Sequence, residues 1–280
     1  MTRPFRLVDV FGTGAFTGNP LAVIADADGL SGEEMQAIAA WLNFSETTFL
    51  LPPRDPAADY RVRIFTMAHE LPFAGHPTLG SAHAWLEAGG RPKTDGTIVQ
   101  ECGVGLVAIR RGADRLAFAA PPLVRGGTPS EAEIDAVAAI LRLDRAAIVD
   151  AAWVDNGPGW IAVMLDSADA VLAVEPVRHH PSHVDIGIVG PHPAGGEAAF
   201  ELRAIFSDAH GGLIEDPVTG SLNASVGQWL FASGRASGGY VAAQGTRLGR
   251  TGRVHVTQDG AGQVWVAGET RTLFVGESGA

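Results

Sequence analysis

The chain of 280 residues contains a single cysteine, Cys102, and little positive charge. One cysteine cannot form an intramolecular disulfide bond or supply the several thiolates of a zinc site, and it excludes chemistry that needs two thiols. The 20 Lys and Arg are outnumbered by 31 Asp and Glu and are scattered along the chain. We therefore expect no nucleic acid partner and no electrostatic binding to a membrane. A small molecule is the expected partner.

Long apolar runs are also missing. No run of 18 or more uninterrupted apolar residues could span a bilayer, and the start Met-Thr-Arg-Pro-Phe lacks the apolar segment of a secretory signal. We expect a cytoplasmic location on these grounds. In contrast, hydrophobic residues make up 46% of the chain and there are 36 glycines. This composition is typical of a compact, turn-rich globular protein.

One pattern occurs twice, about half a chain apart. Glu70-Leu-Pro-Phe-Ala-Gly75 recurs as Glu215-Asp-Pro-Val-Thr-Gly220, and small residues follow both. Ile-Phe-Thr (64–66) precedes the first copy and Ile-Phe-Ser (205–207) the second. Either copy alone is typical of an ordinary loop-to-helix turn, because Gly and Pro mark loops generally. The repetition at one spacing predicts a duplicated domain, with strand, loop, turn and helix in each half.

The start of each repeated helix is a candidate binding site for an anion. A helix N-terminus offers unpaired backbone N–H groups and the positive end of the helix dipole, which suits a carboxylate. Gly75 and Gly220 allow the sharp turn there, and His76 shares the first of these turns. Two such starts, from two related halves, could face one another across a cleft.

Two further polar residues stand in segments that suggest function. Glu46 lies between Phe44 and Phe49, and desolvation raises the pKa of a carboxyl group toward the range of a general acid and base. A solvated glutamate at a strand end is an equally good interpretation. Asn156 lies in the turn 154–158 and could bind a ligand or serve only as a turn residue.

A cluster of three histidines, His179, His180 and His183, suggests a metal site at first sight. Pro181 interrupts any helix there, and no carboxylate stands at a helical ligand spacing. We therefore expect no metal.

Strands outnumber helices in the predicted organisation. Ser31 with Glu34, and Ser130 with Glu133, form capping boxes that start two amphipathic helices. The fold class that follows is α+β, with two similar domains, each a sheet around a buried helix. We place the domains at residues 1–122 and 123–269, with a final strand, 270–280, that can pack onto the first.

Taken in order, these motifs resemble the phenazine biosynthesis PhzF family, which shares the diaminopimelate epimerase fold. The likeness runs nearly end to end and is carried by 18–20 (Gly-Asn-Pro), 43–49, 63–66, 70–77, 156–157 and 215–221. The resemblance implies two domains, each a barrel-like, mostly antiparallel sheet around a central helix. It also implies an active site in the cleft between them and a homodimer.

The resemblance assigns roles to individual positions. Glu46 matches the family's catalytic glutamate, which implies that it removes a proton from carbon and returns it elsewhere. His76 and Asp216 match further catalytic positions, and the remaining matches imply substrate binding by Gly75, Gly220, Ser221 and Asn156. In the enzyme that names the family, the reaction is a cofactor-free isomerisation of trans-2,3-dihydro-3-hydroxyanthranilate. An isomerase of a small, carboxylate-bearing metabolite, without cofactor or metal, is thus expected.

Two alternatives stay open. Racemases of the same fold use one thiol from each domain at the two turns, where this chain has Ala74 and Thr219, so an epimerase would need other bases. A catalytically idle ligand-binding protein is the second alternative. The segment 67–69 (Met-Ala-His) departs from the pattern of many relatives and leaves the substrate open.

Overall fold

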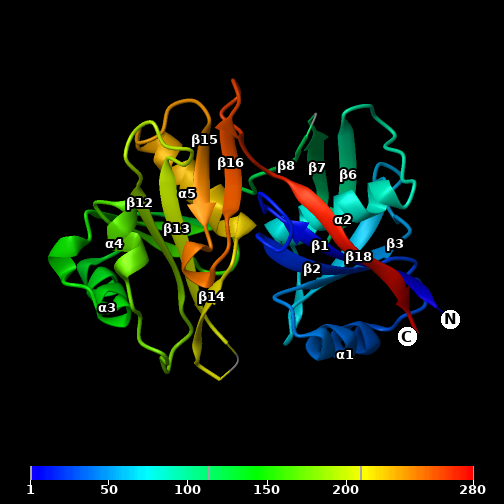
Figure 1. The fold of residues 1–280 in the computed structure, drawn as a ribbon, viewed down its shortest axis with the longest axis horizontal. Helices are drawn as coiled ribbons and strands as arrows, with labels where there is room; N and C mark the ends of the chain where they lie inside the picture. Colours follow the sequence, from blue (N-terminus) through cyan, green and yellow to red (C-terminus); the bar gives the residue numbers. More distant parts are fainter. Residues whose placement is uncertain (1, 113, 209, 280) are drawn as a thin grey trace. The chain divides into compact units, whose positions relative to one another are not determined.

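The computed structural model describes residues 2–112, 114–208 and 210–279. The chain divides into two compact units, Met1–Ala119 with Ala267–Ala280, and Ala120–Val266. Figure 1 shows the first in blue to teal with a red terminal strand, and the second in green to orange. Among the described residues, no helix is long and apolar enough to cross a membrane.

The first unit is a mostly antiparallel sheet with one helix inside it and one outside. Its elements are β1 (Arg3–Val10), β2 (Asn19–Ile24), α1 (Gly32–Leu42), β3 (Thr47–Leu51), β4 (Tyr60–Phe65), β5 (Glu70–Leu71), α2 (Gly75–Glu87), β6 (Thr97–Cys102), β7 (Gly105–Arg111), β8 (Leu116–Ala119) and β18 (Thr270–Ser278). The C-terminal strand β18 pairs antiparallel with β1. Parallel pairs occur where a helix crosses over, from β2 to β3 and from β4 to β6.

Helix α2 is the inner helix. Nine of its thirteen residues are buried. A helix that packs with one face only would bury fewer, and α2 buries more because strands contact it from several sides. Its small residues allow this close packing. A Cβ added at Gly80 would lie 2.5 Å from Leu21 Cδ2 on β2.

Helix α1 covers the outer face of the sheet. The predicted capping box of Ser31 and Glu34 is confirmed. Met35 and Ala39 pack against Phe49 and Phe65 in one apolar cluster. The helix ends at Asn43, whose φ of 60° places it in the left-handed region that commonly terminates helices.

The second unit has the same plan. Its elements are β9 (Arg125–Gly127), α3 (Glu131–Leu141), the 3₁₀ turn Arg145–Ala147, β10 (Asp150–Asp155), β11 (Ile161–Met164), α4 (Ala168–Ala173), β12 (Asp185–Pro191), β13 (Phe200–Ser207), β14 (Leu213–Asp216), α5 (Gly220–Ala232), β15 (Tyr240–Gln244), the 3₁₀ turn Thr246–Leu248 and β16 (Gly252–Gln258). Strand β17 (Val264–Gly268) begins in the second unit, and its last two residues belong to the first. Helix α5 is the inner helix and buries eight of its thirteen residues.

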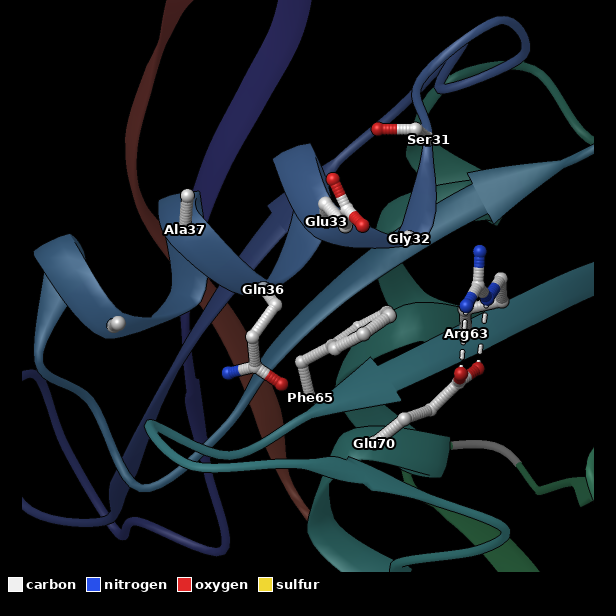
Figure 2. Close-up of a pocket in the computed structure, with 9 residues that line it drawn as sticks. Ser31, Gly32, Glu33, Gln36, Ala37, Arg63, Phe65 and Glu70 are labelled. Carbon is white, nitrogen blue, oxygen red and sulfur yellow. Dashed lines mark hydrogen bonds and ion pairs between the residues drawn. The ribbon is translucent and has the colours of Figure 1, made fainter.

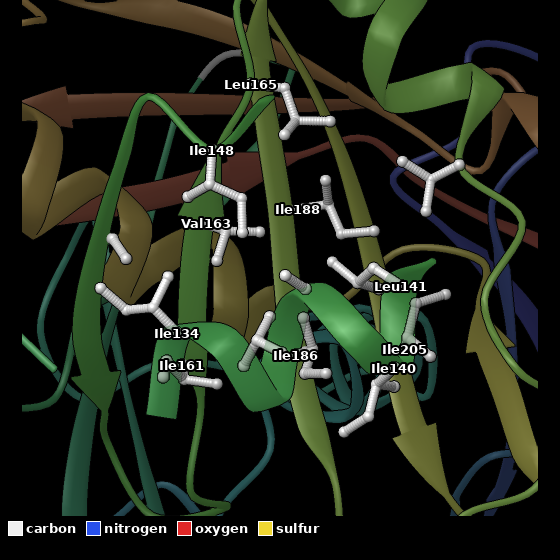
Figure 3. Close-up of a cluster of buried hydrophobic side chains, with 14 of the residues drawn as sticks. Ile134, Ile140, Leu141, Ile148, Ile161, Val163, Leu165, Ile186, Ile188 and Ile205 are labelled. Carbon is white, nitrogen blue, oxygen red and sulfur yellow. The ribbon is translucent and has the colours of Figure 1, made fainter. Parts of the chain in front are cut away.

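The outer face of the second sheet carries α3 and α4. The predicted capping box of Ser130 and Glu133 is confirmed at the start of α3. Figure 3 shows the aliphatic cluster that α3 forms with β11, β12 and β13, with Leu141, Ile186 and Ile205 among its members. The predicted fold class, α+β with two similar sheets around central helices, is confirmed.

The register of the paired strands shows which single positions of the two units correspond to one another. Residues paired across successive strands run Leu7, Ala22, Thr47, Phe65 and Glu70 in the first unit, and Trp153, Ile161, Ile186, Ile205 and Glu215 in the second. By this register Phe65 corresponds to Ile205, one residue away from the match that Ile-Phe-Thr and Ile-Phe-Ser suggest. A shift of one residue exchanges the two faces of a strand, so that short match is not a structural equivalence.

Candidate active site

His76 lies in the first turn of α2, at the inner side of the first sheet. Ala74 is the N-cap residue and has no polar side chain with which to cap the helix. His76 is 3% exposed. Its Nδ1 lies 3.5 Å from Oε2 of Glu46, whose side chain is 16% exposed and directly precedes β3. The structure therefore brings Gly75, His76 and Glu46 together at one helix start.

Burial determines the charge of this histidine. Desolvation lowers the pKa of His76 to about 3, and a hydrogen bond with the backbone of Pro20 opposes only part of that shift. His76 is consequently a neutral imidazole at neutral pH. Its Nδ1 also lies 3.4 Å from Nδ2 of Asn19, which is a donor. The role of Nδ1 depends on the tautomer: with the ring proton on Nε2, its single lone pair can accept from Asn19 or from a protonated Glu46, and with the proton on Nδ1 it can donate to the Glu46 carboxylate.

Asn19 is held in place by the loop between β1 and β2. The buried carboxylate of Asp9 accepts hydrogen bonds from the backbone N–H groups of Thr17, at 2.9 Å, and Gly18, at 2.8 Å. Only glycine fits at position 18, because an added Cβ would lie 2.1 Å from the carbonyl oxygen of Val10. The Gly-Asn-Pro motif thus has a geometric basis in this loop.

In the second unit, Ser221 takes the place of His76, directly after Gly220. The loop between β10 and β11 contacts it twice. Asn156 Nδ2 donates to the Ser221 carbonyl oxygen at 2.8 Å, and Trp160 Nε1 donates to Ser221 Oγ at 3.2 Å. Oδ1 of Asn156 is buried and has no hydrogen-bond partner within the described ranges. The carboxylate of Asp155 organises this loop as Asp9 organises its counterpart, by accepting from two backbone N–H groups.

Asp216 ends β14, one turn before α5, and is 8% exposed. Thr219, the N-cap residue of α5, donates its hydroxyl to Asp216 Oδ2 at 2.6 Å. The structure therefore places Asp216, Gly220, Ser221 and Asn156 around the start of α5.

Sequence reasoning missed two buried glutamines that brace the helix starts. Gln100 on β6 donates to Thr78 Oγ1 at 3.0 Å, and Thr78 in turn donates to the Ala74 carbonyl oxygen. Gln244, on the corresponding strand β15, contacts Thr219 and Asn223. Both glutamines are fully buried. They lie in short strands outside any motif, so only their pairing in space reveals them.

The repeated glutamates have a structural role in both units. Glu70 accepts a bidentate pair of hydrogen bonds from Arg63 across β4 and β5, as Figure 2 shows. Glu215 accepts the same pair from Arg203. Arg63 and Arg203 each lie two residues before the register-equivalent positions Phe65 and Ile205, so the ion pair is part of the duplicated architecture.

An open surface pocket beside these residues is a different feature from the helix-start site. It is lined by Ser31, Gly32, Glu33, Gln36, Ala37, Ala40, Arg63, Phe65 and Glu70, between α1 and the outer face of the sheet (Figure 2). Thr48, which follows Glu46 by two residues, instead faces the inner helix, where Ser81 donates to its hydroxyl. The pocket therefore lies on the opposite face of the sheet from the contact between Thr48 and α2.

The register counterpart of Glu46 in the second unit is Asp185, another carboxylate that sequence reasoning missed. Burial raises its pKa to about 6, and its ion pair with His183 lowers the pKa against that effect. His179 and His180 contact backbone carbonyl oxygens instead. In the part of the chain that the structure describes, no group of His, Cys, Asp and Glu has the arrangement of a metal site.

Comparison with known proteins finds relatives that match nearly the whole length of the chain. The model of the phenazine biosynthesis-like protein family (PhzC-PhzF) matches residues 8–276. Antisense-enhancing sequence 1 of Schizosaccharomyces pombe is 34% identical, over 98% of this chain and 98% of its own. Trans-2,3-dihydro-3-hydroxyanthranilate isomerase of Pseudomonas aeruginosa is 32% identical, over 92% of this chain and 91% of its own.

A solved structure shares the fold. The phenazine biosynthesis protein of the PhzF family from Bacillus anthracis superposes with a TM-score of 0.83. It covers 99% of each chain at 24% sequence identity. This likeness supports the same arrangement of strands around central helices.

Proposed function

The chain belongs to the phenazine biosynthesis-like (PhzC-PhzF) family, and from this premise we propose that it is a cofactor-independent isomerase. The reaction would move one proton within a small metabolite that carries a carboxylate. The observation that carries the proposal is the contact of 3.5 Å between Glu46 and a buried, neutral His76 at the start of α2. The identity with trans-2,3-dihydro-3-hydroxyanthranilate isomerase makes that compound the first substrate to test.

Glu46 is proposed as the single acid and base. Its carboxylate removes a proton from a carbon of the substrate, and the resulting carboxylic acid returns the proton to another carbon of the conjugated system. No redox change and no second reactant are needed for this balance. In the tautomer whose proton is on Nε2, the neutral ring of His76 would accept a hydrogen bond from the protonated form of Glu46 at Nδ1, and this bond would stabilise the intermediate stage in which Glu46 carries the proton.

The proposed binding groups are the two helix starts. Gly75 and Gly220 let backbone N–H groups approach an anion closely. Asn156 has a buried Oδ1 that can accept from a substrate hydroxyl or amino group. Asp216 and Ser221 are proposed as further polar contacts. The tight turn of 66–69, closed by a hydrogen bond from Thr66 N to the His69 carbonyl oxygen, joins β4 to β5 and carries the segment that leaves the substrate open.

A racemase that uses two thiols is not compatible with these residues. Ala74 and Thr219 are the N-cap residues at the two helix starts. Cys102 ends β6 and burial raises the pKa of its thiol. One weakly acidic thiol cannot provide a pair of bases on opposite sides of a carbon atom.

The direct test is incubation of the protein with trans-2,3-dihydro-3-hydroxyanthranilate in D₂O, followed by mass and ultraviolet spectra. We expect a changed ultraviolet spectrum and one deuterium on carbon. An unchanged spectrum and mass would contradict this substrate. Other cyclic carboxylates with hydroxyl or amino groups are then tested in the same way. If none of them acquires deuterium on carbon, that result contradicts proton transfer itself.

A further inference from the structure

We propose that Thr219 and Gln244 are positioning residues that fix the carboxylate of Asp216 for the reaction. The inference rests on the proposed function, because it assigns the residues that orient one of its polar groups. It depends on a chain of hydrogen bonds that lies wholly within the second unit.

The first step concerns the orientation of the Gln244 amide. Its Oε1 accepts from Thr219 N at 3.0 Å and from Asn223 Nδ2 at 2.7 Å. Its Nε2 donates to the Asp216 carbonyl oxygen at 3.2 Å and to Thr219 Oγ1 at 2.9 Å. All four bonds that an amide side chain can form are made. A flipped amide would direct its NH₂ group at two donors, so the orientation is fixed.

The second step concerns the Thr219 hydroxyl, which has one proton. Because this oxygen accepts from Gln244 Nε2, its proton is directed to the other partner, Asp216 Oδ2, at 2.6 Å. A hydrogen bond this short to a carboxylate is of the charge-assisted type. Oδ2 of Asp216 is therefore held as an acceptor, and this bond fixes the orientation of the carboxylate.

The first unit provides an internal comparison. There Gln100 accepts from the Tyr60 hydroxyl and donates to Thr78, whose hydroxyl donates to the Ala74 carbonyl oxygen. Bracing of a helix start by a buried glutamine is thus common to both units and is structural. The position of Thr219 is Ala74 in the first unit, and the position of Asp216 is Leu71. The hydroxyl link occurs only where there is a carboxylate to orient.

The test uses three variants of the full chain. Thr219→Val removes the hydroxyl at nearly constant shape, Thr219→Ser keeps it, and Thr257→Val removes an exposed hydroxyl of the same unit, on β16, as a control. We expect Thr219→Val to lower kcat by about 10- to 100-fold, the usual effect of losing one hydrogen bond to a charged group. KM should change by less than about threefold. Thr219→Ser should restore kcat to within about threefold of wild type, and the kcat of Thr257→Val should equal that of wild type.

Wild-type kcat in Thr219→Val, or equal losses in the Val and Ser variants, would overturn the inference. A second readout does not require any activity. In crystal structures of the variants, we expect Asp216 to keep its wild-type rotamer in Thr219→Ser and to turn away or lose order in Thr219→Val. An unmoved, ordered Asp216 in Thr219→Val would overturn the inference even if the wild-type protein isomerised none of the compounds tested.

Discussion

Arg203 and Glu215 form a buried bidentate ion pair, and its counterpart in the first unit, Arg63 with Glu70, is exposed. The side chains of Arg203 and Glu215 are 4% and 10% exposed, against 28% and 42% for Arg63 and Glu70. Arg203 also donates to the carbonyl oxygens of Val171 and Val174 at the end of α4. One duplicated interaction therefore occurs in two dielectric environments within one chain.

The two ion pairs predict very different costs of mutation. Glu215→Gln leaves the Arg203 guanidinium buried without its carboxylate, and breaking a buried pair typically costs roughly 3–5 kcal/mol. Glu70→Gln breaks an exposed pair, which is worth roughly 0–1 kcal/mol. Thermal unfolding of both variants beside wild type measures the difference. Equal shifts in Tm would show that burial does not set the strength of these pairs.

The loop that holds Asn19 predicts a second contrast, between two glycines. Gly18→Ala would place a Cβ 2.1 Å from the Val10 carbonyl oxygen and 2.6 Å from Asp9 Oδ1, whereas the nearest atom to a Cβ at Gly14 is 4.0 Å away. We expect Gly18→Ala to displace Asn19 and lower kcat at least about tenfold. Gly14→Ala should behave like wild type. Steady-state rates of both variants test this prediction. Full activity in Gly18→Ala would show that catalysis does not depend on the position of this loop.

Burial of His76 predicts a dependence of stability on pH. The unfolded chain takes up a proton on this histidine below about pH 6.5, while the folded protein resists protonation until about pH 3. The unfolded state thus binds more protons between these values, so stability falls as the pH is lowered through the window, by up to about 1.4 kcal/mol per pH unit.

The comparison that isolates this effect is urea unfolding of wild type, His76→Gln and His69→Gln at pH 7, 6 and 5. His69 is exposed and serves as the control. We expect His76→Gln to lose less stability than wild type on acidification, and His69→Gln to follow wild type. Parallel curves for all three proteins would contradict a neutral, buried His76.

Much of the fold could be predicted because local signals and the repeat agreed. The capping boxes at Ser31 and Ser130 depend on residues three positions apart, which sequence shows directly. The repeated Glu-x-Pro-x-x-Gly turns showed where the inner helices begin. Gly75, Gly220 and His76 could be named for the same reason, whereas Asp216 and Ser221 were named from the resemblance to the family, and the roles of all five remain predictions.

The rest depends on strand register, which the sequence does not display. The equivalence of Glu46 and Asp185 follows only from counting paired residues across β2, β3 and β4 and across β11, β12 and β13. Gln100 and Gln244 lie on short strands that pair in parallel with distant ones. Their polar side chains would be expected outside a core, and they are buried because partners far along the chain satisfy them.

The most direct test of the account is deuterium incorporation from D₂O by Glu46→Gln, beside wild type and Glu33→Gln. Glu33 lies in the exposed first turn of α1, so its variant controls for the loss of one charge. We predict that Glu46→Gln folds with an unchanged Tm and incorporates deuterium at least about 100-fold more slowly, while Glu33→Gln matches wild type. A folded Glu46→Gln that incorporates deuterium within threefold of the wild-type rate would contradict Glu46 as the acid and base.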